Sequence, residues 1–243
     1  MKKYGLIGFP LGHSFSVPYF KEKFSKENLL DSIYEAYPLD QIQKLNKVFD
    51  DNPELIGLNV TIPYKEAVIP FLDELEEKAM KIGAVNTIKI KNGKRIGYNT
   101  DILGFQNSLL PLIEDSFVQG LILGTGGAAK AVAFVLEELG IPFRYVSSKP
   151  STENINYQDL NENWIKSHTL IIHCSPLGMY PHIDSFPDIP YQYLGEGHIL
   201  FDLIYNPEET LFLKKGREMG ARTKNGLEML YRQAEASWEI WNT

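Results

Sequence analysis

Two serines separated by one residue, Ser14 and Ser16, follow an apolar run and a turn in the segment LIGFPLGHSFS. Two hydroxyls at this spacing can both face one carboxylate if the backbone turns between them. Charge-assisted hydrogen bonds of this kind are worth about 1.5–3 kcal/mol each. Either hydroxyl could instead cap the helix that is expected to follow. The pair therefore predicts a site for an anionic ligand, with helix capping as the alternative.

Further short polar side chains stand at the ends of predicted strands in the first hundred residues. Asn59 and Thr61 lie in NVTIPYK, and Asn86 lies in GAVNT. Such side chains both donate and accept hydrogen bonds, which suits a polyhydroxylated ligand at the strand-end rim of an α/β sheet. Lys65 and Asp101 add an ammonium and a carboxylate that together could hold and return a proton. Taken singly, the lysine is typical of a surface charge and the aspartate of a helix N-cap.

The segment GTGGAA places Gly124, Gly126 and Ala129 in the G-x-G-x-x-A pattern, between an apolar strand and a helix. In that context the pattern is typical of dinucleotide binding. The first glycine permits a tight turn, the second lets the backbone approach a pyrophosphate, and the alanine permits close helix–strand packing. The helix amides would face the phosphates. A tight turn in a non-binding α/β domain is the alternative.

The next predicted strand ends in YVSSKP, which holds Ser147, Ser148 and Lys149 and no carboxylate. A carboxylate at this point would accept hydrogen bonds from the ribose of NAD and repel a 2′-phosphate, whereas hydroxyls and an ammonium would hold that phosphate. The segment therefore favours NADP. A solvated loop lysine is the alternative interpretation of Lys149.

The elements that must position these residues alternate along the first half of the chain. Apolar spacing predicts strands at 4–9, 32–39 and 55–63, helices at 17–26, 40–51 and 73–82, and a hairpin turning at 91–94. We expect Asp40 to be the N-cap of the second of these helices, and the third to end near Gly83.

The second half has continuously apolar strands, which are typical of a parallel sheet that is covered on both faces. They are expected near 120–123, 143–148, 169–175 and 198–205, and a helix near 102–114 links the two halves. An aperiodic, Pro-rich loop at 175–197 is long enough to suggest a role at a site. The last segment, 227–241, predicts an amphipathic helix.

Bulk composition is that of an ordinary globular chain of one or two domains: 243 residues, 44% hydrophobic and 23% charged. The net charge of −7 argues against a protein that binds a nucleic-acid backbone. The single cysteine, Cys174, excludes an internal disulfide and lies in an apolar run, so a buried core residue is favoured over a reactive thiol. The sequence shows neither a signal peptide nor an 18-residue apolar run, so we expect a cytoplasmic protein.

Eight segments, in order and over essentially the whole chain, resemble those of the shikimate dehydrogenase family: GHSFS, NVTIPYK, GAVNT, GYNTDILG, GTGGAAKA, SPLGM, DLIYNP and GLEMLYRQA. The resemblance implies an α/β fold with an N-terminal substrate-binding domain that contains a mixed sheet (residues 1–101 and 227–243) and a Rossmann-like NADP-binding domain (residues 102–226). The C-terminal helix would return to the first domain. The implied activity is the reversible NADPH-dependent reduction of 3-dehydroshikimate to shikimate, on the route to aromatic amino acids.

The resemblance also implies roles for single residues. Lys65 and Asp101 would form the catalytic pair, which supplies a proton to the alkoxide as the hydride arrives. Substrate would be bound by Ser14 and Ser16 through its carboxylate, and further by Thr61, Asn86, Tyr205 and Gln233. The cofactor would contact Gly124, Gly126, Gly127, Ala128, Ser147, Ser148, Lys149, Met179 and Gly226, and no metal is expected. The expected partner is a small-molecule substrate, with no nucleic acid and no membrane, in a monomer or homodimer.

Three departures from the family pattern bear on these expectations. Val17 separates Ser16 from Pro18, where the family usually has proline directly after the second serine. The pair His173-Cys174 precedes SPLGM, where Asn-Ala or a similar pair is usual. Ser148 stands in place of the arginine of the usual Asn-Arg-Thr, followed by Lys149, which binds phosphate as a point charge rather than as a fork.

Two other functions stay open at this level. One is a quinate/shikimate dehydrogenase that prefers NAD, which the missing acid after the second strand of the cofactor domain disfavours. The other is a non-catalytic NADP-binding module, which the Lys65 and Asp101 pair disfavours. A cyclohydrolase-type folate enzyme of similar architecture fits neither GHSFS nor GLEMLYRQA.

Overall fold

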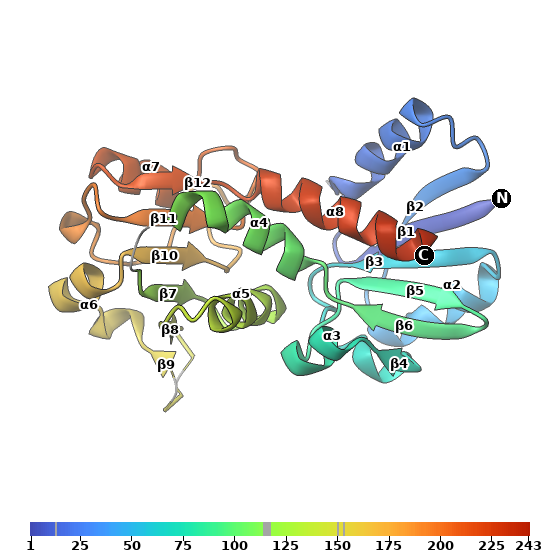
Figure 1. Ribbon diagram of the computed structural model, residues 1–243, viewed down its shortest axis with the longest axis horizontal. Helices are drawn as coiled ribbons and strands as arrows, with labels where there is room; N and C mark the ends of the chain where they lie inside the picture. Colours follow the sequence, from blue (N-terminus) through green and yellow to red (C-terminus); the bar gives the residue numbers. More distant parts are fainter. Residues whose placement is uncertain (13, 114–117, 150, 153) are drawn as a thin grey trace. The chain divides into compact units, whose positions relative to one another are not determined.

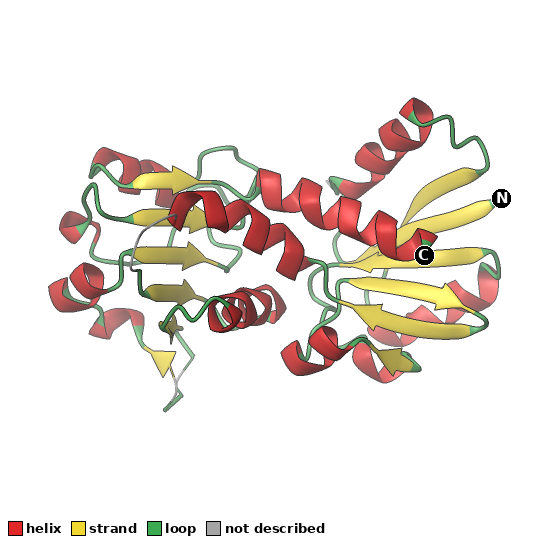
Figure 2. Cartoon of the chain, viewed as in Figure 1, coloured by secondary structure: helices red, strands yellow, loops and turns green. Residues whose placement is uncertain are grey.

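The computed structural model describes residues 1–12, 14–113, 118–149, 151–152 and 154–243. The chain divides into two compact units. The first comprises Met1–Thr100 together with Ala234–Thr243, and the second comprises Asp101–Gln233. Each unit is built around its own six-stranded sheet (Figures 1 and 2).

The sheet of the first unit is mixed and has the order β2-β1-β3-β5-β6-β4. Strands β2, β1 and β3 are parallel, β5 is antiparallel to both β3 and β6, and β4 is parallel to β6. The strands are β1 Lys2–Gly8, β2 Ser32–Pro38, β3 Leu55–Val60, β4 Glu74–Leu75, β5 Thr87–Lys91 and β6 Lys94–Tyr98. The helices are α1 Ser16–Lys26, α2 Leu45–Asp51 and α3 Glu77–Ile82, with 3₁₀ turns at Ile42–Lys44 and Ile69–Phe71.

Apolar side chains are buried on both faces of this sheet, because successive residues of a strand face opposite sides. Along β1, Tyr4 and Leu6 join one core cluster and Ile7 joins the other. The first cluster also receives Trp241, from the C-terminal end of α8 (Leu227–Asn242), whose indole N–H donates to the Ile88 carbonyl at 2.9 Å. A Cβ at Gly57 would lie 2.1 Å from that indole nitrogen, so only glycine fits there. The C-terminal helix therefore returns to the first sheet, as predicted.

The sheet of the second unit is entirely parallel and has the order β12-β11-β10-β7-β8-β9. Counted within the unit, this is the doubly wound order 3-2-1-4-5-6 of dinucleotide-binding sheets. The strands are β7 Gly120–Leu123, β8 Phe143–Val146, β9 Asn154–Ile155, β10 Leu170–His173, β11 Ile199–Asp202 and β12 Arg222–Lys224. The helices that lie wholly in this unit are α4 Asp101–Ile113, α5 Gly127–Glu138, α6 Glu162–Ser167 and α7 Leu211–Glu218, with 3₁₀ turns at Tyr157–Asp159 and Tyr191–Tyr193.

The topological switch point of this second sheet lies between β7 and β10, from which the strand order runs outward in both directions. Ligands of open α/β sheets bind at the carboxyl ends of the strands at such a point. Strands β7, β10 and β11 are buried at every residue, which agrees with the continuously apolar runs of the sequence. The residues that follow β7 and β10 are therefore the ones this fold places for a dinucleotide.

Several local predictions can be compared with the structure. The hairpin is confirmed: Asn92 and Gly93 both have positive φ (54° and 76°) between β5 and β6. Gly83 ends α3 with φ 68°, but the strand β4 was missed and α3 begins only at Glu77. The prediction of Asp40 as an N-cap is wrong, because its carboxylate binds Lys44, four residues on, and the chain enters α2 through a 3₁₀ turn. Residue 114 of the expected linking helix lies outside the described residues; α4 is described to Ile113.

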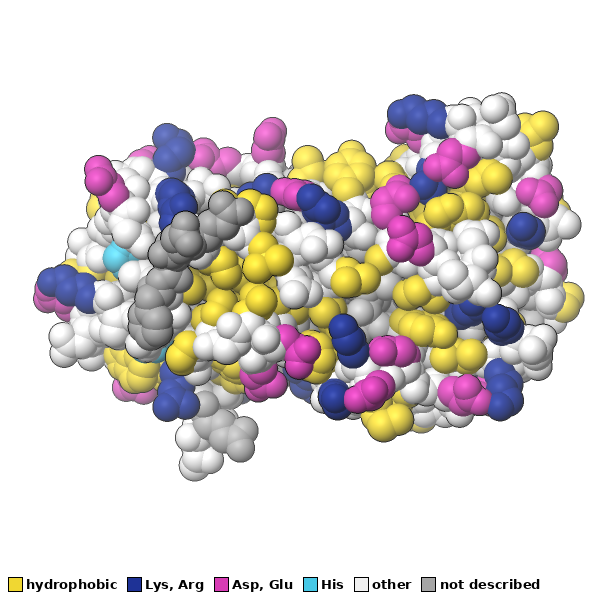
Figure 3. Space-filling model, viewed as in Figure 1, with side chains coloured by type: hydrophobic (Ala, Val, Ile, Leu, Met, Phe, Trp, Pro, Cys, Tyr) yellow, Lys and Arg dark blue, Asp and Glu magenta, His cyan; other side chains and the backbone are white. Residues whose placement is uncertain are grey.

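Within the described residues, no helix has the length and apolar character needed to cross a membrane. On the face seen in Figure 3, Lys and Arg side chains are scattered among Asp and Glu rather than gathered into one stripe.

Candidate functional site

The loop that follows β1 carries the two serines. The N-cap of α1 is Phe15, and no side-chain cap bond is made there. The Ser14 hydroxyl is inaccessible to solvent and has no hydrogen-bond partner among the described residues. Leaving a buried hydroxyl unsatisfied costs about 1–3 kcal/mol, and native structures rarely do so without a reason. The loop therefore holds one donor that a bound ligand could satisfy.

Ser16 begins a buried polar network that runs through the first unit. Its hydroxyl is hydrogen-bonded to that of Tyr34, which in turn donates to Oδ1 of Asn59 at 2.8 Å. Burial raises the pKa of Tyr34, so this phenol stays protonated and keeps its donor role. The Asn59 amide donates to the hydroxyl of Ser237, in α8, at 2.9 Å. The network thus joins the residue after the first loop to the C-terminal helix.

The other end of the same network holds Asn86. The Ser237 hydroxyl lies 2.8 Å from that of Thr87 and 3.2 Å from that of Thr100. Asn86 donates to the Thr100 hydroxyl at 2.9 Å and accepts from the Thr100 backbone N–H at 2.7 Å. Its side chain is therefore held in one orientation, 2% exposed, by the residue that precedes Asp101.

Lys65 and Thr61 lie in the turn that follows β3. The Thr61 N–H donates to the Ile7 carbonyl at 2.9 Å, which fastens this turn to the end of β1. The Lys65 carbonyl accepts from the N–H of Val85, the neighbour of Asn86, at 2.7 Å. Hydrogen bonds therefore bring the backbone at residues 65, 85–86 and 100 together within the first unit. Lys65 itself is partly buried.

Asp101 opens α4 and is the first residue of the second unit. It is 4% exposed and lies inside the first helical turn, so the expectation of an N-cap is replaced by a first-turn position. Its charge, with that of Asp202, adds to burial in raising the pKa of the Cys174 thiol. Asp101 is therefore within electrostatic range of the end of β10, and Cys174 is held as a protonated thiol rather than a reactive thiolate.

The glycine turn lies between β7 and α5, at the switch point. Gly124 has φ 120°, and a Cβ there would lie 3.3 Å from the Cys174 backbone, so a side chain would be strained. Gly126 is the N-cap of α5, where no side chain caps the helix, and Ala129 is fully buried. The amides of Gly127 and Ala128 belong to the first turn, which has no acceptor within the helix. These are the amides that could face a pyrophosphate.

The turn after β8 contains the three residues predicted to meet a 2′-phosphate. The Ser147 side chain accepts the backbone N–H of Lys149 at 3.1 Å and is 7% exposed, so this hydroxyl shapes the turn. Ser148 and Lys149 are both exposed. The exposed pair thus provides the hydroxyl and the ammonium that this turn offers to a ligand.

The loops after β10 and β11 carry Met179 and Tyr205 and contact each other. The Tyr180 N–H donates to the Asn206 carbonyl at 3.1 Å. Met179 is 38% exposed, and Tyr205 is half-buried. Gly226 donates its N–H to the Ile204 carbonyl, and a Cβ on it would lie 2.1 Å from the backbone oxygen of Leu203. Only glycine fits here, because the chain passes directly against the segment that carries Tyr205.

Gln233, the last predicted substrate residue, is partly buried in α8 and donates to the Leu230 carbonyl at 2.9 Å. The sequence analysis missed Tyr34 and Ser237 as polar members of the network. A tyrosine in an alternating strand and a serine within an apolar helix face are weak signals, since both are common as packing residues. Groups of His, Cys, Asp or Glu that could hold a metal are absent from the described residues.

The chain is similar to known proteins over nearly its whole length. Residues 6–88 match the family model "Shikimate dehydrogenase substrate binding domain". The NADP(+) shikimate dehydrogenase of Desulforamulus reducens is 36% identical over 98% of this chain and 88% of its own length, and that of Methanococcus maripaludis strain C6 is 39% identical over 99% and 91%.

Solved structures agree with these matches. The shikimate dehydrogenase of Aquifex aeolicus superposes with a TM-score of 0.89 at 34% identity, over 100% of this chain and 92% of that one. The Thermus thermophilus enzyme in complex with NADP(H) and shikimate gives 0.86 at 27% identity, over 99% and 93%. A Corynebacterium glutamicum quinate dehydrogenase in complex with NAD gives 0.84 at 25% identity, over 99% and 93%. The fold is therefore shared by members with different cofactors.

Proposed function

Because the chain belongs to the shikimate dehydrogenase family, we propose that it catalyses the reversible NADPH-dependent reduction of 3-dehydroshikimate to shikimate. The names of both curated relatives support this activity and this cofactor. The observation in this chain that carries the proposal is the buried Ser14 hydroxyl without a partner in the described protein, in the loop where a substrate carboxylate is expected.

Substrate binding is proposed for side chains of both units. Ser14 donates to the carboxylate, and Ser16 would turn its single proton from Tyr34 to the same group, since hydroxyls satisfy a carboxylate with charge-assisted bonds. Ring hydroxyls are bound by Thr61, Asn86, Tyr205 and Gln233. Support comes from the fixed orientation of Asn86 and from the close passage of Gly226 against the segment that carries Tyr205.

Proton transfer is proposed for Lys65 and Asp101. When bound, NADPH supplies the hydride for the carbonyl carbon of the substrate. The Lys65 ammonium donates a proton to the oxygen that becomes the alcohol, and Asp101 steadies that ammonium and helps to restore its proton. Support comes from the bond between Val85 and Lys65 and from the bond between Thr100 and Asn86, which hold both chain positions around Asn86.

The residues at the switch point fit a dinucleotide. The turn at Gly124 and Gly126 and the amides of Gly127 and Ala128 would hold the pyrophosphate. Ser147 shapes the turn in which Ser148 and Lys149 would hold the 2′-phosphate. Met179 and Gly226 would line the nicotinamide side. These residues would bind and orient the cofactor.

Steady-state kinetics with shikimate and quinate, each with NADP⁺ and NAD⁺, test the proposal. We expect the highest kcat/KM with shikimate and NADP⁺. A higher value with quinate or NAD⁺ would support the second candidate, a quinate/shikimate dehydrogenase that prefers NAD. That candidate is favoured by the similarity to an NAD-bound quinate dehydrogenase and by Ser148 in place of the family's arginine, which leaves only Lys149, a point charge, to bind the phosphate.

The absence of turnover in all four combinations, despite NADP⁺ binding, would indicate a non-catalytic NADP-binding module. A cytoplasmic location and a monomeric or homodimeric state stay predictions. Light scattering of the purified protein would test the second of these.

A further inference from the structure

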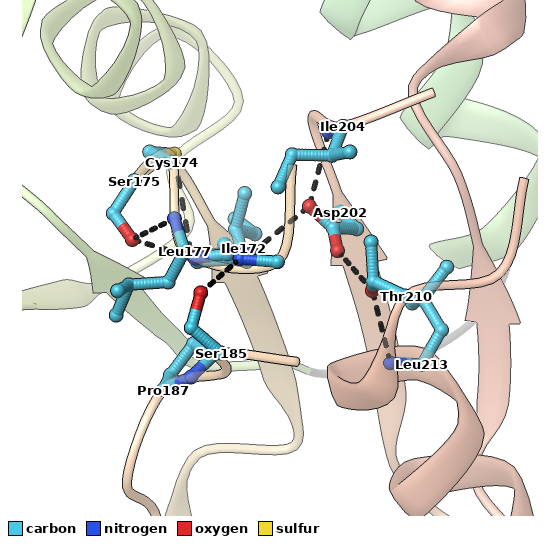
Figure 4. A network of polar contacts seen from close by, with 12 residues as sticks. Ile172, Cys174, Ser175, Leu177, Ser185, Pro187, Asp202, Ile204, Thr210 and Leu213 are labelled. Carbon is cyan, nitrogen blue, oxygen red and sulfur yellow. Dashed lines mark hydrogen bonds and ion pairs between the residues drawn. The ribbon is translucent and has the colours of Figure 1, made fainter. Parts of the chain in front are cut away.

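A fully buried imidazole–carboxylate pair joins the ends of the neighbouring strands β10 and β11, and Figure 4 labels its carboxylate, Asp202, with Ser175 and Thr210. His173 and Asp202 are the last residues of these strands and face each other in the parallel register. The His173 Nδ1 atom lies 3.0 Å from Oδ1 of Asp202, and both side chains are 0% exposed. The Asp202 carboxylate also accepts from the Ile204 N–H at 3.0 Å and from the Thr210 hydroxyl at 2.5 Å. None of these residues has a role in the reaction proposed above.

The other nitrogen of the imidazole faces Ser175. Its Nε2 atom lies 2.6 Å from Oγ of Ser175, which is partly exposed at the carboxyl end of β10. The same backbone lies beside the glycine turn, since a Cβ at Gly124 would be 3.5 Å from the Ser175 nitrogen. This hydroxyl therefore stands at the switch point, where this fold binds a dinucleotide.

The direction of the Ser175 hydroxyl depends on which nitrogens of the imidazole carry a proton. The Asp202 carboxylate accepts all its bonds, so Nδ1 of His173 carries a proton. The proposal takes the imidazole as neutral, and Nε2, 2.6 Å from Ser175 Oγ, is then an acceptor to which the Ser175 O–H donates. The connectivity is that of a serine–histidine–aspartate triad, in which the carboxylate fixes the tautomer in the same way. The Ser175 oxygen is left with two lone pairs and can only accept from other groups.

One of these lone pairs has a weak partner in the protein. The Leu177 N–H donates to Ser175 Oγ at 3.4 Å, and no other described group donates to it. The second lone pair can accept from a ligand N–H. Of the groups on the nicotinamide side of NADP, the carboxamide carries such an N–H₂ donor. We therefore propose that Ser175 accepts a hydrogen bond from the carboxamide, and that His173 and Asp202 are positioning residues that hold its hydroxyl in the accepting direction.

This inference rests on the proposed function, because it takes NADP as the cofactor. Its test compares NADP⁺ with its 3-acetylpyridine analogue, in which a methyl ketone replaces the carboxamide and removes the N–H donor. Calorimetry without substrate measures both dissociation constants, so the readout is binding and not turnover. One neutral hydrogen bond contributes about a 2- to 12-fold difference in affinity. We expect the wild-type protein to prefer NADP⁺ by roughly this factor.

Ser175→Ala should abolish this preference, and Ser175→Thr, which keeps a hydroxyl, should preserve it. Ser167→Ala removes a hydroxyl from α6 in the same unit and should leave the ratio unchanged. His173→Asn can still donate to Asp202 but cannot reach Ser175, so it should reduce the ratio although Ser175 is intact.

The binding of 2′-phospho-ADP-ribose, which lacks the nicotinamide, should be equal in all variants, and this separates a positioning role from general loss of structure. An unchanged ratio in Ser175→Ala would overturn the proposal. If His173→Asn does not fold, the Ser175 variants still decide the matter. Failure of the wild-type protein to bind either dinucleotide would instead contradict the proposed function.

Discussion

The two units of the molecule each contain a buried polar network, but the networks differ in charge. The first unit joins Tyr34, Asn59 and Ser237 through hydroxyls and amides, all neutral groups. The second joins His173 to the carboxylate of Asp202. A neutral hydroxyl can exchange its donor and acceptor roles when a neighbour is lost, whereas a buried carboxylate only accepts. The first network should therefore tolerate the loss of a member, and the second should not.

The comparison extends to function. Residues of the first unit are proposed to hold the substrate, so their loss should change kcat or the KM for shikimate. The network of the second unit is proposed to fix a cofactor contact and also ties two strand ends together, so its loss should change stability and cofactor affinity. Variants in each region can test this division.

Lys65→Ala should give the largest effect. Removing a general acid typically lowers the rate by about 10²–10⁴-fold. We expect this loss in kcat, measured with saturating shikimate and NADP⁺, with little change in the KM for shikimate. The matched control is Lys94→Ala, which removes an exposed lysine of β6 that is paired with Glu74 of β4. Near-normal kcat in the Lys65→Ala protein would contradict the role of Lys65 as the proton donor.

Asp202→Ala should give the largest loss of stability. It leaves the buried imidazole N–H and the donors at Ile204 and Thr210 without their acceptor, and each buried donor left unsatisfied costs about 1–3 kcal/mol. Urea denaturation measures the change in the free energy of unfolding. Glu209→Ala, which breaks an exposed pair with Arg217, should cost no more than about 1 kcal/mol. Equal losses in the two variants would mean that burial of the His173 pair has no energetic consequence.

The features that could be predicted from the sequence are those encoded over a few neighbouring residues. The glycine turn at Gly124 and the Asn92-Gly93 hairpin need positive φ, which few residues supply, so each leaves a local signature. The Ser14 and Ser16 pair was noticed by spacing alone. Local spacing also predicted the amphipathic C-terminal helix, whereas its return to the first unit was implied only by the family resemblance.

The features that could not be predicted depend on pairing between distant segments. Asn59 and Ser237 are 178 residues apart, and nothing near either of them in the chain indicates the other. His173 was noticed only as a departure from the family pattern, because its partner is fixed by the register of β10 on β11. At Asp40 a local pattern gave a wrong prediction. Aspartate is a common N-cap, but in the structure the Asp40 carboxylate accepts from Lys44 instead of from the helix backbone.

Ser14→Ala tests whether a polar group of the first unit serves ligand binding rather than stability. The Ser14 hydroxyl has no partner among the described groups, so its removal should leave the free energy of unfolding of the ligand-free protein unchanged or slightly raised. The KM for shikimate should rise by roughly 10-fold or more, since a hydrogen bond to a charged group contributes about 1.5–3 kcal/mol. Ser25→Ala, at an exposed position of α1, is the control. A variant that loses stability while its KM is unchanged would show that the hydroxyl serves the fold.

Ser237→Ala should give the smallest effect and is the sharpest test of the neutral network. The Ser237 hydroxyl is hydrogen-bonded to Asn59, Thr87 and Thr100. These partners are also close to one another: the hydroxyls of Thr87 and Thr100 lie 3.3 Å apart, and the Asn59 amide nitrogen lies 3.3 Å from the Thr87 hydroxyl. These groups can bond to one another when the serine is removed, so the free energy of unfolding should fall by only about 1 kcal/mol.

Because Asn86 keeps both bonds to Thr100, the KM for shikimate should change less in Ser237→Ala than in Ser14→Ala. Urea denaturation and steady-state kinetics on the same preparation measure both quantities. A loss comparable to that of Asp202→Ala would mean that the hydroxyls cannot exchange roles. The neutral network would then be as intolerant of deletion as the charged one, and the contrast between the two units would lie in function alone.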